Sequence, residues 1–376
     1  MRMQLRQTSL AGDLFKSALA LGLGPLALMT TTPVSAESAP TEGHISFRVL
    51  NYQDSQPDLE RIAVRAPALG IFLPLGDDYA LEAGFIQDTI SGASPAYHAV
   101  KASAQTMLDR RDATDLRLTR YFPSGNMSVA AAYSKESDYV SQAISVSASQ
   151  HSDSKNTTLV LGAGHTQDTI NPMNHLVADA RKSVNDVLLG ITQIWTPLDI
   201  VQLNLTLSYG NGYYTDPYKL LDHRPAERKS AAALLRWNHR FDHLQSTLRM
   251  GFRHYQDSYA IRSSTITLEW AQEMQDSWTI TPMLRAYRQS AAYFYIPADP
   301  SAPGSIPIPD GVVLGESPMS FDHRLSAFDS NTWGLKIAKK LDAVWAVEAR
   351  WERYRQRSSE TPLDATFSQL AITRSF

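Results

Sequence analysis

The stretch Ile200–Gly210 reads IVQLNLTLSYG and alternates strictly between apolar and polar side chains. Successive residues of a strand point to opposite faces, so this period of two predicts a β-strand with one apolar and one polar face. Strands of soluble sheets are about five or six residues long, whereas a tilted strand that crosses a bilayer needs about ten. This stretch is long enough to cross. Its apolar face would carry Val201, Leu203, Leu205, Leu207 and Tyr209, and its polar face Gln202, Asn204, Thr206 and Ser208.

The same alternation recurs along the chain, and it predicts sixteen strands, an even number. Fourteen or eighteen strands stay open, because Pro67 and Pro282 interrupt two segments and predict a bulge or an edge adjustment there. The predicted strands are 44–54, 60–73, 79–90, 112–122, 127–136, 139–150, 157–168, 183–195, 199–210, 229–240, 244–257, 260–273, 278–294, 328–340, 344–356 and 365–376.

Short connections rich in turn residues, such as Pro74–Asp78 and Pro123–Asn126, alternate with longer ones, of which Tyr295–Ala327 is the longest. Short inner turns and long outer loops are typical of bacterial outer-membrane barrels. The final strand ends on Phe376 and resembles the C-terminal signal of such barrels, although Arg374 departs from that pattern. The fold class predicted is therefore all-β, a transmembrane antiparallel up-and-down barrel. An aromatic girdle is expected at the inner strand ends, from Trp195, Trp237, Trp270, Trp278, Trp333 and Trp345.

The N-terminus predicts export. Residues 1–36 combine basic residues, the short apolar run Ser17–Met29 and small residues at Val34 and Ala36, which is typical of a cleaved signal peptide. Residues 37–376 would then form the barrel, with outer-membrane lipid around it. The chain has no cysteine and a net charge of -3 without a basic block, which argues against nucleic acid as a partner.

The apolar face fixes which charged side chains point into the lumen. Two interpretations of them stay open: a wet interior held by cross-strand ion pairs, or a charge-lined path for a solute. The loop Tyr295–Ala327 is a candidate constriction or an ordinary surface loop. The predicted inward charges are Arg48, Asp54, Glu82, Asp88, Asp115, Arg117, Asp168, Asp186, Arg236, Arg240, Arg249, Arg253, Asp257, Glu269, Arg285, Lys336, Lys340, Glu348, Arg350 and Glu352.

A short Gln-Asp-Ser/Thr motif places Asp54, Asp88, Asp168 and Asp257 at the outer ends of four upward strands. These carboxylates either finish their strands by starting a turn or line the mouth as an ion site. Calcium prefers six to eight oxygen ligands, and Asp88, Asp168 and Asn171 are the candidates for such a site. No other cofactor is expected.

Catalytic signatures are weak. Ser94 and His98 share one loop and offer a minimal pair for acyl transfer, but the nucleophile-elbow and zinc-protease motifs are both absent. We therefore expect no enzyme, and an outer-membrane hydrolase is the alternative.

Six stretches resemble an uncharacterised bacterial family, domain of unknown function thirty-five seventy. They are Thr89–Pro95, Ser134–Ser141, Thr215–Ser230, Phe252–Thr265, Leu284–Tyr295 and Phe321–Phe328. The resemblance implies an outer-membrane barrel encoded beside a lipoprotein, a thioredoxin-like protein and a flavin transferase. It assigns no catalytic residue.

Together these patterns favour a porin-like conduit for a small solute or ion, or a membrane scaffold for a periplasmic redox-associated system. The scaffold would hold a lipoprotein or a thioredoxin-like partner.

Overall fold

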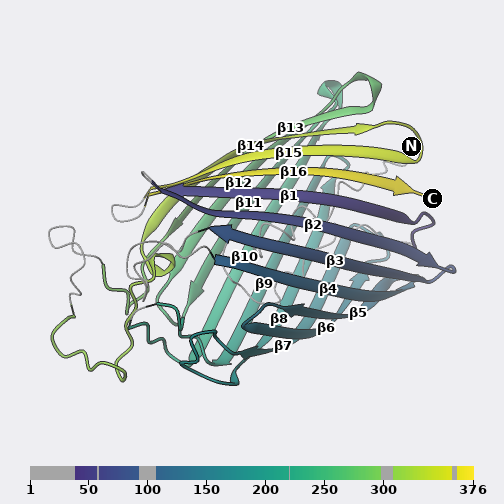
Figure 1. The fold of residues 1–376 in the computed structure, drawn as a ribbon. Coiled ribbons are helices and arrows are strands. Elements are labelled where there is room, and N and C mark those ends of the chain that lie inside the picture. The colour runs from purple at the N-terminus through teal and green to yellow at the C-terminus, as the bar shows by residue number, and fades with distance from the viewer. Residues whose placement is uncertain (1–38, 57–58, 93–106, 220, 298–307, 358–361) are drawn as a thin grey trace.

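Sixteen antiparallel strands close into one barrel, which confirms the predicted fold (Figure 1). The computed structural model describes residues 39–56, 59–92, 107–219, 221–297, 308–357 and 362–376, so the predicted signal peptide lies outside the described residues. The strands are β1 (His44–Gln56), β2 (Leu59–Leu75), β3 (Tyr79–Gly92), β4 (Met107–Phe122), β5 (Gly125–Lys135), β6 (Tyr139–His151), β7 (Thr157–Ile170), β8 (Ala180–Thr196), β9 (Asp199–Gly212), β10 (Glu227–Phe241), β11 (Ser246–Asp257), β12 (Arg262–Glu273), β13 (Trp278–Gln289), β14 (Phe328–Lys340), β15 (Trp345–Arg357) and β16 (Leu363–Ser375). Three 3-10 helices interrupt the connections, η2 (Asp242–Leu244), η3 (Gln275–Ser277) and η4 (His323–Leu325).

Each strand pairs with its neighbours in sequence, and β1 pairs with β16 to close the sheet. That last ladder runs from His44 opposite Ser375 to Ser55 opposite Asp364. Closure leaves no free sheet edge, so the backbone amides and carbonyls of the strands find partners within the barrel. Among the described residues, no helix is long and apolar enough to cross a membrane.

The two ends of the barrel differ. At the inner end, Gly43 and Phe376 exchange two backbone hydrogen bonds, and the connections are tight turns. At Gly125, after one such turn, an added Cβ would lie 1.9 Å from the carbonyl oxygen of Ser149, so only glycine fits there. The longer connections, including residues 213–219, 221–226, 290–297 and 308–327, lie at the opposite, outer end (Figure 1).

Two strand boundaries differ clearly from the prediction. β13 ends at Gln289 rather than at residue 294, because the chain beyond it turns into an outer loop, where the Ala292 amide donates to the Leu325 carbonyl (2.8 Å). β4 begins at Met107, five residues earlier than predicted.

The expected bulges at Pro67 and Pro282 are wrong. Both prolines face outward, and the ladders β2–β3 and β12–β13 lack pairs beside them but resume in the same register. A proline removes only one donor, so its strand keeps the ladder to its other neighbour. The described ladders shift register instead between Gln53 and Ser55 and between Ile194 and Thr196.

The two faces of the sheet follow the predicted alternation. In β9, Leu205 is 42% exposed on the outside, whereas its neighbour Asn204 is 5% exposed on the inside. Residues of the outer face contact lipid rather than a protein core in a membrane barrel, which explains why large apolar side chains remain uncovered.

Most of the expected aromatic girdle is present on the outer face. Trp195, Trp278 and Trp345 lie at the inner ends of their strands, and Trp237 and Trp270 lie close to the inner ends of β10 and β12. The expected position of Trp333 is wrong: it lies in the middle of β14.

Neighbouring side chains account for two details of this girdle. Trp333 packs edge-on against Trp351 on β15, with ring centroids 4.8 Å apart. Arg374, which departs from the terminal signal, lies 5.7 Å from the Trp345 ring, so its charge gains a cation–π contact at the membrane interface.

The lipid-facing assignment predicts a difference between two adjacent positions. Leu205→Arg places a charge on the outer face in the middle of β9 and is expected to lower the free energy of unfolding by about 2–4 kcal/mol. Thr206→Arg, at the next residue, places the charge on the inward face and is expected to lower the free energy of unfolding much less. Guanidinium unfolding of the barrel in lipid vesicles measures both, and equal losses would contradict the assignment of faces.

Candidate functional site: the inward face and the outer cap

The inward face of the barrel carries charge from one end to the other. The pairing register places all the side chains predicted to face inward on one common face of the sheet. Asp88 lies opposite Arg111, and Gly84 lies opposite Asp115. Ala371 lies opposite both Glu348 and Arg48, so these two charged side chains share the same face. The inward face therefore carries charged side chains on many neighbouring strands.

Asp88, Asp168 and Asp257 each meet a basic side chain of a neighbouring strand. The Arg111 Nε donates to Asp88 Oδ2 (2.7 Å), and the Lys182 Nζ lies 3.0 Å from Asp168 Oδ2. The Arg228 Nη2 donates to Asp257 Oδ2 (2.6 Å). All three carboxylates are buried.

Asp54 accepts hydrogen bonds beside the register shift between β1 and β2. Its carboxylate accepts from the Ile62 amide (3.0 Å) and from the Tyr52 hydroxyl (2.8 Å). The strand-finishing role stays a prediction for all four carboxylates.

Sequence reasoning missed the basic partners Arg111, Lys182 and Arg228. Each lies at the outer end of a strand that neighbours its carboxylate, at a position with inward parity. The alternation of faces along each strand could therefore have predicted that these three side chains face inward. Which carboxylate each one meets on the next strand follows only from the register.

Closer to the inner end of the barrel, Glu348, Arg350 and Glu352 of β15 take part in two ion pairs. Arg350 forms an ion pair with Glu352, and Lys336 on β14 lies 3.9 Å from Glu348. On β11, Arg249 lies 3.7 Å from Glu269 of β12. The Lys336–Glu348 and Arg249–Glu269 pairs join adjacent strands through the inward face, whereas Arg350 and Glu352 lie on the same strand.

Arg253 and Arg285 are different, because no ion pair joins either of them to a carboxylate within the described part of the chain. The Arg253 guanidinium instead lies 5.2 Å from the centre of the Tyr255 ring. These two arginines are therefore inward cations available to a solute.

The calcium site stays a prediction. Asp88 and Asp168 each contact a cation of the chain itself, and the Asn171 side-chain oxygen accepts from the Asp179 amide (2.6 Å). Among the described residues, no group of three or more His, Asp or Glu side chains is placed to hold a metal ion.

The two longest described outer loops pack together into what we call the outer cap, residues 213–226, 290–297 and 308–326. The His223 amide and carbonyl exchange hydrogen bonds with Met319 (both 2.8 Å), which joins the loops by a short bridge. One apolar cluster, built around Phe294, Ala292 and Leu325, fastens the cap to Tyr259 in the β11–β12 connection.

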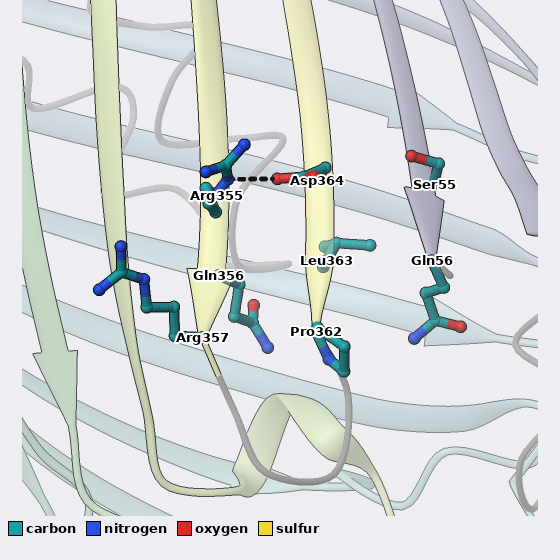
Figure 2. Close-up of a pocket in the computed structure, with 8 residues that line it drawn as sticks. All are labelled: Ser55, Gln56, Arg355, Gln356, Arg357, Pro362, Leu363 and Asp364. Atoms are coloured by element: carbon teal, nitrogen blue, oxygen red, sulfur yellow. Dashed lines mark hydrogen bonds and ion pairs between the residues drawn. The ribbon is translucent and has the colours of Figure 1, made fainter. Parts of the chain in front are cut away.

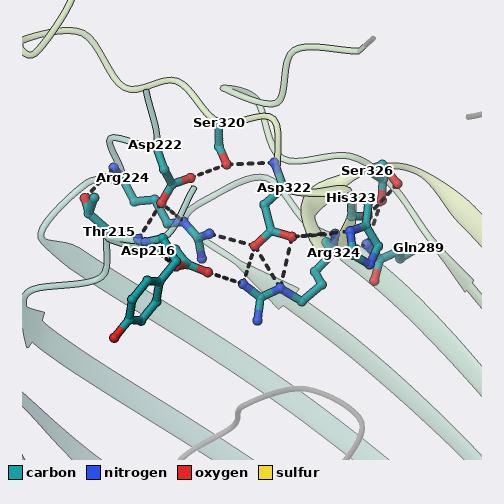
Figure 3. Close-up of polar contacts among 11 residues, drawn as sticks. Thr215, Asp216, Asp222, Arg224, Gln289, Ser320, Asp322, His323, Arg324 and Ser326 are labelled. Atoms are coloured by element: carbon teal, nitrogen blue, oxygen red, sulfur yellow. Dashed lines mark hydrogen bonds and ion pairs between the residues drawn. The ribbon is translucent and has the colours of Figure 1, made fainter. Parts of the chain in front are cut away.

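A buried ionic network joins the two loops of the cap (Figure 3). The Arg224 guanidinium lies 2.8 Å from both Asp222 and Asp322. Arg324 contacts Asp322 and reaches across to Asp216 (2.7 Å). Each loop thus contributes both acidic and basic side chains, and the Arg224–Asp322 and Arg324–Asp216 pairs join the two loops.

Burial and charge act in opposite directions on the two central carboxylates. Burial raises the pKa of Asp222, although Arg224 opposes it. Burial also acts to raise the pKa of Asp322, but the charges of Arg324 and Arg224 outweigh it and hold that pKa below its usual range. The ion pairs of Asp322 therefore contribute stability above the pKa of an unfolded aspartate, about 3.9, and lose it as the pH falls below that.

A shallow cleft of about 510 Å³ lies at the outer rim, where β1, β15 and β16 end (Figure 2). Gln56, Gln356 and Arg357 line it, and Arg355 donates to Asp364 (3.1 Å) beside them. Its open, polar shape offers no enclosed site.

The chain matches the model of the family described as "Protein of unknown function (DUF3570)" over residues 14–108 and 103–373. The chain belongs to this family. No curated protein sequence matches it.

Solved structures with a similar fold are outer-membrane barrels. CdiB from Acinetobacter baumannii aligns with a TM-score of 0.47 and 9% identity over 88% of this chain, which spans 60% of that one. A FadL homologue of Pseudomonas aeruginosa aligns with a TM-score of 0.43 and 9% identity over 89% of both chains. OccK1 (OpdK) of the same organism aligns with a TM-score of 0.44 and 8% identity over 89% of this chain and 98% of that one.

Four of the stretches that resemble the family converge in or under the cap. Thr215–Ser230 supplies Arg224, and Phe321–Phe328 supplies Asp322. Phe252–Thr265 and Leu284–Tyr295 supply the two halves of the apolar cluster beneath them. The sequence shows these stretches as separate, and only the fold brings them together.

The predicted catalytic pair Ser94 and His98 lies outside the described residues, so an outer-membrane hydrolase stays a prediction.

The ionic network predicts how the cap would open. Asp322→Asn keeps the size of the side chain but leaves Arg224 and Arg324 facing each other without the charge between them. Breaking a buried pair costs about 3 kcal/mol or more, so the Ala292 and Ile296 amides are expected to exchange with deuterium about 100-fold faster. Asp329→Asn, which breaks an exposed pair with Arg288 outside the barrel, is the matched control. Equal exchange in both variants would contradict a structural role for the network.

Proposed function

We propose that this protein is a conduit in the outer membrane that lets a small polar or charged solute cross. The observation that carries this proposal is the inward face, which is polar along whole strands. In β9, for example, Gln202, Asn204, Thr206 and Ser208 all share it.

Barrel size supports the proposal. Barrels of about eight strands are filled by their own side chains, whereas those of sixteen strands or more have room for an aqueous path. The inward side chains of strands such as β9 are polar and can be hydrated.

The inward charges are unevenly distributed, which would favour one sign of solute on one wall. Among described side chains, β1–β9 carry Asp54, Glu82, Asp88, Asp115, Asp168 and Asp186 against Arg48, Arg111, Arg117 and Lys182. On β10–β15 the balance reverses, with Arg228, Arg236, Arg240, Arg249, Arg253, Arg285, Lys336, Lys340 and Arg350 against Asp257, Glu269, Glu273, Glu348 and Glu352. A transverse field between two such walls orients a polar solute as it passes.

The proposal includes the cell location. Cleavage of residues 1–36 would export the chain, and residues 37–376 would fold in the outer membrane with the cap outside. N-terminal sequencing of the membrane-extracted protein, with Glu37 as the expected first residue, tests this part.

A scaffold for a periplasmic redox-associated system stays a prediction, because it rests on the family resemblance alone. Copurification with a lipoprotein or a thioredoxin-like protein in mild detergent is its test.

Planar-bilayer recording of the purified protein tests the conduit. We expect stepwise ionic current in the unmodified protein and a smaller step for Thr206→Trp, which adds a large ring to the inward face. Leu207→Trp, the adjacent outward position, serves as the control and should conduct normally. No current from correctly folded, unmodified protein would overturn the proposal.

A further inference from the structure

Arg253 and Arg285 face each other across β12. Arg253 lies opposite Thr265 and Arg285 opposite Thr267, and Thr265 lies in turn opposite Tyr287. On the inward face, β12 presents Thr265 and Thr267, both short side chains, between these two arginines. Their like charges repel each other.

This pair differs from the other inward cations nearby. Arg228 and Arg249 both have carboxylate partners, at 2.6 and 3.7 Å. Two cations that lack such a partner and share a partly buried wall are stabilised by any anion that can reach them.

Tyrosines surround the pair in a repeated pattern. The segments Arg253-His-Tyr255-Gln-Asp257 and Arg285-Ala-Tyr287-Arg-Gln289 both place an arginine, a tyrosine and an acceptor on the inward face. β15 repeats the last two elements, with Tyr354 and Gln356.

In all three strands the tyrosine hydroxyl donates to the acceptor two residues further on. The distances are 2.9 Å for Tyr255 to Asp257, 2.6 Å for Tyr287 to Gln289 and 2.9 Å for Tyr354 to Gln356. With their hydroxyls fixed in this way, the tyrosines present ring faces rather than polar groups to the lumen.

The outer cap and its neighbouring connection hold two of these acceptors in place. The Gln289 amide donates to the carbonyls of Arg324 (3.1 Å) and Ser326 (2.7 Å) in the cap. Asp257 accepts from the backbone amides of Tyr259 and Ile261, both at 3.0 Å. The wall beneath the cap is therefore fixed before any ligand arrives, which lowers the entropic cost of binding.

We propose that Arg253 and Arg285, with the rings of Tyr255, Tyr287 and Tyr354, bind a small organic carboxylate that carries a planar ring. A guanidinium group matches the two oxygens of a carboxylate, and Arg253, which lies over the Tyr255 ring, keeps its edge free to donate. The tyrosine rings pack against the planar part of the ligand. This site rests on the proposed function, because the solute reaches the site through the lumen.

Binding of benzoate to the full-length protein in detergent, measured by equilibrium dialysis, tests the site without requiring any current. Arg253→Gln and Arg285→Gln are each expected to weaken binding about tenfold, and the double variant about 100-fold. Arg249→Gln is the matched control, because it removes an inward arginine of the same strand that already has Glu269 as its partner. An equal loss in the control, or no loss in the double variant, would overturn the assignment.

A second series separates the rings from the charges. Tyr287→Leu should weaken benzoate but not inorganic phosphate, and benzamidine, the cationic analogue of benzoate, should not bind. If phosphate binds as tightly as benzoate, or if benzamidine binds equally, the site does not select a planar carboxylate and the proposal fails.

Recording in bilayers distinguishes this proposal from the conduit itself. Benzoate should reduce the current of the unmodified protein and not that of the double variant. Benzoate binding without any current would support the site and reject the conduit, whereas current that benzoate leaves unchanged would reject the site and support the conduit.

Discussion

Closure of the β1–β16 ladder is the interaction on which the rest of the structure depends. Inside a bilayer, an unpaired backbone amide or carbonyl costs several kcal/mol, so a sheet with open edges cannot remain there. The twelve pairs from His44–Ser375 to Ser55–Asp364 remove both edges at once. Closure also fixes which face is inside, and with it the position of every charged side chain that a solute would meet.

Ion pairs on the inward face have a structural consequence as well as an electrostatic one. Asp88 with Arg111 and Asp168 with Lys182 link neighbouring strands at the outer rim, where the ladders are about to end. Their charges are largely neutralised by each other, so they contribute little to the field in the lumen. Arg253 and Arg285 keep their charge available, and this contrast separates residues that hold the barrel from residues that can hold a solute.

The outer cap shows how loops far apart in sequence become one rigid unit. Asp222 and Asp322 are buried, Arg224 lies between them and pairs with both, and Arg324 also pairs with Asp322. The cap in turn fixes Gln289 and, through it, the ring of Tyr287. A change in the cap is therefore transmitted to the inward wall by a chain of hydrogen bonds.

The sequence by itself determined the strands and their two faces, because side-chain alternation such as Val201 to Tyr209 is a local property with a period of two. It favoured sixteen strands but left fourteen or eighteen open, and closure of the barrel decided the number. It did not reveal that β13 stops at Gln289 or that Pro67 and Pro282 leave the register unchanged, since both depend on what the adjacent strands and loops do. Only the tertiary structure decided that Asp168 meets Lys182, that Arg253 and Arg285 lack such partners, and that four distant stretches meet in the cap. The physical reason is that pairing across strands depends on the register, which closure of the whole barrel sets and no single segment contains.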